Sequence, residues 1–262
     1  MKQLSRAGVA FAALCAALLG FMDIALAAPE TVTETRQVDA RVVRIKVDGV
    51  VDLRIRQGAI PMLVLSGDPR LLGKTTTLQR GDTIDISSET RGMHINLGRN
   101  KGLRADLTLP NLREVNSESV GGTSISGFAG DELLLNLDGA GSMDVSSCIY
   151  RDIQASLGGV GSMKVQGIDS ESVVLDLSGA GYVTLSGRSR QLKAELAGLG
   201  GLDAQGLSAQ HVTLELSGLG NAAVNARDSA NLTLSGMGSV TVHGKPVNRK
   251  LSLDGLGKVN WK

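Results

Sequence analysis

The sequence predicts an all-β protein, namely a right-handed parallel β-helix with coils of about 19–20 residues. A Gly-x-Gly triplet recurs every 18 to 20 residues through the second half of the chain. On both sides of each triplet, apolar residues alternate with polar ones, which is the spacing of half-buried strands. One such unit cannot bury its apolar face alone, so the units must stack as coils. Crossovers between parallel strands are almost always right-handed, which sets the expected hand.

The repeat defines the coils. Counted from the first glycine of a triplet, apolar residues occupy positions −4, −2, +4 and +6, as Leu175, Leu177, Val183 and Leu185 do around Gly179. A degenerate copy precedes the first full triplet. We therefore expect eight coils between residue 115 and the C-terminus, spaced at about 4.8 Å. The paired glycines are Gly139/Gly141, Gly159/Gly161, Gly179/Gly181, Gly198/Gly200, Gly218/Gly220, Gly236/Gly238 and Gly255/Gly257.

The residue between the two glycines is always apolar, and we expect it to line the inside of the corner as an aliphatic ladder. Substituting Leu199 or Leu219 with Asp should then collapse the rod, because an unpaired charge would be buried. Trp261 falls at an inward position of the last coil and is expected to plug its open end. The residues between the glycines are Ala140, Val160, Ala180, Leu199, Leu219, Met237 and Leu256.

The N-terminal part lacks the glycine period but still alternates as strands. The expected strands are residues 41–47, 51–56, 62–65, 83–86 and 103–109. We interpret this part as the first coils or cap of the same body, or as a small β region that abuts it. The predicted organisation is a signal peptide over 1–27, this N-terminal β region over 28–110, and the repeat coils over 111–262.

The first 27 residues have the layout of a Sec signal peptide. Lys2 and Arg6 precede an apolar run over residues 7–19, and small residues at Ala25 and Ala27 suit a signal peptidase. The expected cleavage lies between Ala27 and Ala28. The protein is then exported to the periplasm, the cell surface or the medium, with no transmembrane segment after cleavage.

Composition argues against several classes of ligand. The chain has six aromatic residues, too few for stacking platforms that would bind sugars or single-stranded nucleic acid. Removal of Lys2, Arg6 and Asp23 with the leader leaves 25 basic and 25 acidic residues. This balance does not force a basic face of the kind needed to neutralise phosphates, so nucleic acid is not an expected partner.

Several units closely match a known family. The segments LDGAGSMDV, LSGAGYVTLSG, LSGLGNAAV and LSGMGSVTVHG resemble the putative auto-transporter adhesin head GIN domain of bacterial envelope proteins, as do VDGVVDLRIRQG and LTLPNLREV upstream. The resemblance covers nearly all of the mature chain. It implies a right-handed parallel β-helix, an exported location and a family without an established activity, and it transfers no catalytic residues.

The best candidate site is a row of three carboxylates, Asp176, Glu195 and Glu215, which should face outward on consecutive coils. Carboxylates about 5 Å apart repel each other by about 1 kcal/mol per adjacent pair in water. A bound cation such as calcium would relieve that repulsion. The alternative is a solvated acidic face. No catalytic residues and no cofactor are expected, because the histidines are scattered and no Ser-His-Asp pattern occurs.

These observations favour an exported, non-enzymatic β-helix protein of the cell envelope. Its role would be binding or adhesion toward an unknown envelope or extracellular ligand, or structural presentation of its surface. A poorly capped last coil also predicts end-to-end self-association. The alternative is a polysaccharide lyase or hydrolase built on the same scaffold, with the carboxylate row in its active site.

Overall fold

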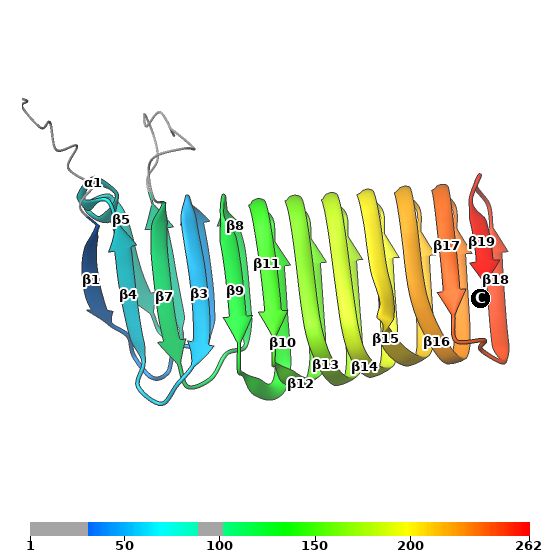
Figure 1. Ribbon diagram of the computed structural model, residues 1–262, viewed down its shortest axis with the longest axis horizontal. Coiled ribbons are helices and arrows are strands. Elements are labelled where there is room, and N and C mark those ends of the chain that lie inside the picture. Colours follow the sequence, from blue (N-terminus) through cyan, green and yellow to red (C-terminus); the bar gives the residue numbers. More distant parts are fainter. Residues whose placement is uncertain (1–30, 89–101) are drawn as a thin grey trace, which may run out of the picture.

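A computed structural model describes residues 31–88 and 102–262, so the expected signal peptide lies outside the described residues. The chain forms a rod of stacked coils in which nearly every strand pairs in parallel with the equivalent strand of the next coil (Figure 1). The right-handed parallel β-helix predicted from the sequence is confirmed.

Each coil of the repeat region has two β faces joined by the Gly-x-Gly corner. The strands β8, β10 and β12 belong to the first face, and β9 and β11 to the second. From β13 to β16 each strand continues through the other corner into the first face of the next coil. In chain order these strands are β8 (Glu114–Ser119), β9 (Gly122–Ser126), β10 (Ala129–Leu137), β11 (Ala140–Ser146), β12 (Ile149–Leu157), β13 (Val160–Leu177), β14 (Ala180–Leu196), β15 (Leu199–Leu216), β16 (Leu219–Leu234), β17 (Met237–His243), β18 (Asn248–Leu253) and β19 (Lys258–Trp261).

The core is a set of aliphatic stacks that run along the rod. In one stack Leu175 lies opposite Ala194, which lies opposite Leu214 on the following coil. All three side chains occupy position −4 of their coils and are buried, as the spacing predicts. Burying this continuous apolar interior is the main favourable term in folding, since no single coil has an interior of its own.

The N-terminal strands belong to the same sheet, and a strand occurs at each of the five predicted places, although the first begins at Arg44 and not at residue 41. Strands β2 (Arg44–Gly49) and β3 (Val51–Gln57) form a coil beside β8 and β9. Strands β6 (Thr83–Ser88) and β7 (Leu103–Leu109) stack on the other side of that coil. The chain therefore passes over the β2–β3 coil on its way from β7 to β8, an order of coils that the sequence did not predict.

A cap closes the N-terminal end of the rod (Figure 1). Here β1 (Val32–Gln37), β4 (Met62–Gly67) and β5 (Thr75–Arg80) join the sheet in antiparallel pairings, β4 with β7 and β5 with β6. The short helix α1 (Pro69–Leu72) buries Leu71 and Leu72 against it. The strand β4 was predicted, whereas β1, β5, the helix and the antiparallel pairing are additions to the predicted N-terminal strands.

The prediction that the residues between the glycines line the inside of the corner is wrong. Inward and outward positions alternate without interruption through the corner, so buried Leu216 and buried Ala222 flank inward-facing Gly218 and Gly220. Leu219 lies at an odd offset from Leu216 and therefore faces solvent. Since the glycines fill the inward positions, the apolar residues between them form a row outside the rod.

Close approach of neighbouring coils, more than a special backbone angle, explains the paired glycines. A Cβ atom at Gly220 would overlap the carbonyl oxygen of Gly200 one coil earlier, and a Cβ at Gly218 would overlap that of Gly198. Only Gly161 and Gly200 among the paired glycines have a positive φ, 158° and 144°. The corner is thus packed backbone against backbone, which leaves room for hydrogen alone on its inner side.

Candidate functional site

A row of aliphatic side chains runs along the outside of the Gly-x-Gly corner, and we call it the aliphatic row. Leu199 pairs with Leu219 and Leu219 with Met237 in the parallel register. Their exposed fractions are 56%, 46% and 53%, and that of Leu256 in the last coil is 84%. A contiguous exposed surface of large aliphatic groups is typical of an interaction site. The row consists of Val120, Ala140, Val160, Ala180, Leu199, Leu219, Met237 and Leu256.

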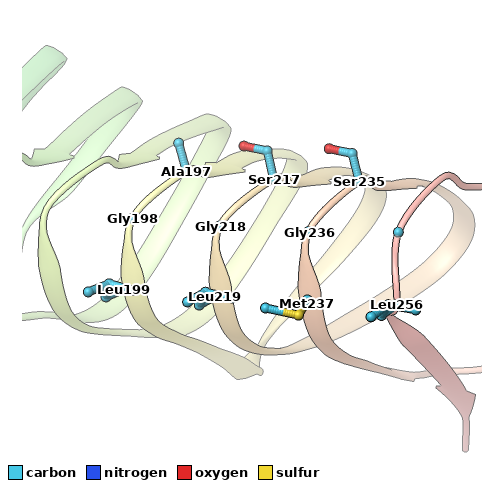
Figure 2. Close-up of a pocket in the computed structure, with 11 residues that line it drawn as sticks. Ala197, Gly198, Leu199, Ser217, Gly218, Leu219, Ser235, Gly236, Met237 and Leu256 are labelled. Carbon is cyan, nitrogen blue, oxygen red and sulfur yellow. The ribbon is translucent and has the colours of Figure 1, made fainter.

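Beside the row lies a shallow groove of about 390 Å³. Figure 2 shows the two walls of the groove as parallel lines of side chains with the corner glycines between them. One wall is the C-terminal half of the aliphatic row, from Leu199 to Leu256, and the other wall is made of Ala197, Ser217 and Ser235. Among the residues that the structure describes, no charged side chain lines this groove, so its character is apolar with two hydroxyl groups on one side.

The backbone of the groove has few hydrogen-bond donors left for a ligand. The Leu219 amide donates to the Gly198 carbonyl at 3.1 Å, and the Met237 amide donates to that of Gly218 at 3.2 Å. The Gly218 amide likewise donates to Leu196 at 3.0 Å. These amides are committed to the stacking of the coils, and what remains accessible is aliphatic surface.

The three predicted carboxylates do come together. Asp176 pairs with Glu195, and Glu195 pairs with Glu215, on three consecutive coils. Lys193 lies two residues before Glu195 on the same outward face. Within residues 31–88 and 102–262, no group of three or more His, Cys, Asp or Glu side chains is placed to hold a metal ion. Cation binding at this row stays a prediction, and the solvated acidic face remains its alternative.

The last coil is basic. Residues 244–262 include five Lys or Arg residues and one Asp, a net charge of +4. The guanidinium carbon of Arg249 lies 4.6 Å from the ring centre of Trp261, a cation–π contact. Trp261 is partly buried and packs against the core, in agreement with the expected plug. Leu251 and Leu253 of β18 are nevertheless exposed, so the plug covers only part of this end.

Other reactive side chains are structural or solvated. Burial raises the pKa of the Cys148 thiol, which opposes formation of the nucleophilic thiolate. His211 lies opposite Gln191, and its Nδ1 is 2.9 Å from the Ser229 hydroxyl on the exposed surface. Partial burial and the nearby charge of Asp203 raise the pKa of Tyr182, which lies on the outer surface.

Sequence reasoning missed the aliphatic row as a surface feature, although the signal was present. The parity of the alternation identifies it, because positions −2, 0, +2 and +4 share one face of the chain and position +1 lies on the other.

The part of the chain that the structure describes contains no helix long and apolar enough to cross a membrane.

Comparison with solved structures identifies the same fold elsewhere. A putative adhesin from Bacteroides fragilis aligns with a TM-score of 0.69 and 20% identity, covering 89% of this chain and 97% of the other. A putative lipid binding protein from Parabacteroides distasonis aligns with a TM-score of 0.79 and 20% identity, covering 88% and 96%. A putative adhesin from Parabacteroides merdae gives 0.77 and 17% identity, covering 89% and 96%.

No curated protein matches the chain in a sequence search. The family model described as "Putative auto-transporter adhesin, head GIN domain" matches residues 43–246, which include the coils from β2 to β17 and both walls of the groove except for its last rung. This match covers more than three quarters of the chain. The chain therefore belongs to the family of the putative auto-transporter adhesin head GIN domain.

Proposed function

We propose that this protein is an exported, non-enzymatic binding protein of the cell envelope with an adhesin-like role. The observation that carries the proposal is the in-register repetition of outward side chains, above all the aliphatic row. A repeated row offers a ligand the same contact on every coil, which suits extended ligands and multivalent attachment. The description of the family as an adhesin head supports the same interpretation.

A relative of the same fold carries the name of a putative lipid binding protein. An aliphatic surface on this chain agrees with a ligand of that kind. The groove therefore favours a lipid as the ligand, because it offers a polar polymer few polar groups to contact.

The alternative, a polysaccharide-acting enzyme, depends on the carboxylate row. If Asp176, Glu195 and Glu215 perform catalysis, their joint replacement by amides abolishes turnover of a polysaccharide substrate. In the binding proposal the same variant keeps full ligand binding, because these side chains lie outside the groove.

Location is tested by protease treatment of intact cells that carry a cleavable tag after Lys262. A rigid β-helix resists cutting, so the tag is the probe.

Loss of the tag on intact cells supports a surface role, and adherence of those cells to host or bacterial surfaces is then compared with a deletion strain. Protection until lysis contradicts surface adhesion and leaves a periplasmic binding role. Retention in the cytoplasm contradicts export itself.

A further inference from the structure

We infer that the groove beside the aliphatic row binds the alkyl chain of a monomeric long-chain fatty acid anion, with the carboxylate held by the basic last coil. This inference deepens the proposed binding function and rests on it. The site consists of the groove wall from Leu199 to Leu256, the opposite wall from Ala197 to Ser235, and Lys258 just beyond.

The size of the exposed surface selects a small ligand over a second protein. Each large aliphatic side chain removes about 100 Å² of apolar surface from water when it is fully buried. Leu199, Leu219, Met237 and Leu256 are each about half exposed or more, so together they offer on the order of 240 Å². A stable protein interface needs about 800 Å² on each partner. The row alone is too small for a dimer of this chain.

The same surface matches one alkyl chain. Burial of one methylene removes about 30 Å² from water, so about 240 Å² corresponds to about eight methylene groups in contact with the row. Neighbouring coils are about 4.8 Å apart, which places Leu256 about 14 Å from Leu199 along the rod. An extended chain of 12 to 14 carbons covers this length.

Hydrogen bonding argues against an extended peptide in the groove. A peptide that docks as a strand needs free backbone partners. The amides of Gly218, Leu219 and Met237 already donate to the preceding coil. An alkyl chain needs no such partners.

Charge fixes the direction of the ligand. Asp176, Glu195 and Glu215 lie on the first face, on the Ala197 and Ser217 side of the corner, and they repel a carboxylate placed in the middle of the rod. The last coil carries a net charge of +4 even with exposed Asp254 two residues before Leu256, and it provides exposed Lys258 two residues after Leu256. The carboxylate therefore lies at the last coil and the methyl end points toward Leu199. The acidic row also disfavours contact of this side with an anionic membrane.

The test is calorimetric titration of the full chain with myristate below its micelle concentration. We expect one saturable site. The double variant Leu199→Ser and Leu219→Ser should bind at least tenfold more weakly with an unchanged melting temperature. The matched control Ile149→Ser removes an equally exposed aliphatic side chain away from the groove and should bind like the wild type. Lys258→Gln should weaken binding of myristate severalfold and leave binding of myristyl alcohol unchanged.

Three outcomes overturn the inference. These are the absence of saturable binding, wild-type affinity in the double variant, and binding to phosphatidylglycerol vesicles without binding to the monomer. An equal effect of Lys258→Gln on the acid and the alcohol overturns the assigned direction. If myristate does not bind but tagged cells still adhere, the fatty-acid site is wrong and the proposed binding function stands.

Discussion

Leu199 and Leu219 lie opposite each other on consecutive coils, and both side chains face solvent at the outside of the corner. Leu219→Asp should therefore change the free energy of unfolding by about 0.5 kcal/mol, as surface substitutions do. Leu216→Ala, three residues away in the core, should cost about 2–5 kcal/mol. Denaturant unfolding of the two variants measures the contrast. If Leu219→Asp does not fold, the result supports the earlier prediction that Leu219 faces the inside of the corner.

Gly220→Ala should destabilise the rod by about 3 kcal/mol or more, or prevent folding. The added Cβ would overlap the Gly200 carbonyl oxygen, and neither backbone can move without breaking the stack of coils. Ser235→Ala on the exposed wall of the groove is the control and should stay within about 0.5 kcal/mol of the wild type. Thermal melts followed by circular dichroism compare the two, and equal melting temperatures would contradict the tight corner.

Replacing Asp176, Glu195 and Glu215 by Asn, Gln and Gln should leave stability unchanged or raise it by about 1 kcal/mol at low salt. Repulsion between neighbouring carboxylates is the reason, and screening should remove the gain at high salt. Melting curves at the two salt concentrations measure the effect. A rise in the melting temperature of the wild type with millimolar calcium, absent in the triple variant, would instead identify a cation site.

The protonation of Asp39 should make the free energy of unfolding depend on pH in the acid range. Its carboxylate accepts hydrogen bonds from the side chain and the backbone amide of Arg41, which lowers the pKa of Asp39 from 3.8 to about 2. Since the folded pKa is the lower one, the stabilisation is complete above pH 4 and is lost as the pH falls toward 2. Asp39→Asn should flatten this part of the pH profile. Carboxyl resonances followed by NMR give the pKa directly, and a value near 4 would contradict the prediction.

Molecules should associate through their last coils more strongly when salt screens the positive charge there. Leu251 and Leu253 are exposed there, and over the described residues β18 and β19 pair on one side only. Basic side chains protect such edges against pairing. Sedimentation of the wild type should show association that rises with salt and protein concentration. Lys250→Thr with Lys258→Thr should associate already at low salt, and a strictly monomeric double variant would contradict end-to-end stacking.

Much of the fold follows from local pattern. The triplet period places the coils, and the alternation around Gly179 correctly assigns Leu177 and Val183 to the core. The carboxylate row could also be predicted, because equal coil lengths bring equal offsets together, as with Glu195 and Glu215. Within the repeat coils, the location of the residues between the glycines was predicted wrongly, because the corner was treated as a break in the alternation.

The N-terminal cap and the order of the first coils could not be predicted. Nothing in the strand patterns states that β4 pairs antiparallel with β7, or that β2 lies between β6 and β8. The Tyr150 hydroxyl donates a hydrogen bond to the Leu112 carbonyl at 2.7 Å, although the two residues are 38 positions apart in the chain. Burial raises the pKa of this tyrosine, and that burial also depends on packing against distant segments.

The sequence by itself determined the coil period, the inward residues of the repeat strands and the family, because side-chain alternation and glycine spacing are properties of neighbours along the chain. The tertiary structure alone decided the order of the N-terminal coils, the cap and the groove beside Leu199 and Leu219. Those features depend on which backbone groups of distant segments hydrogen-bond to each other. They also depend on how closely two coils approach at Gly220, a distance that only the assembled stack sets.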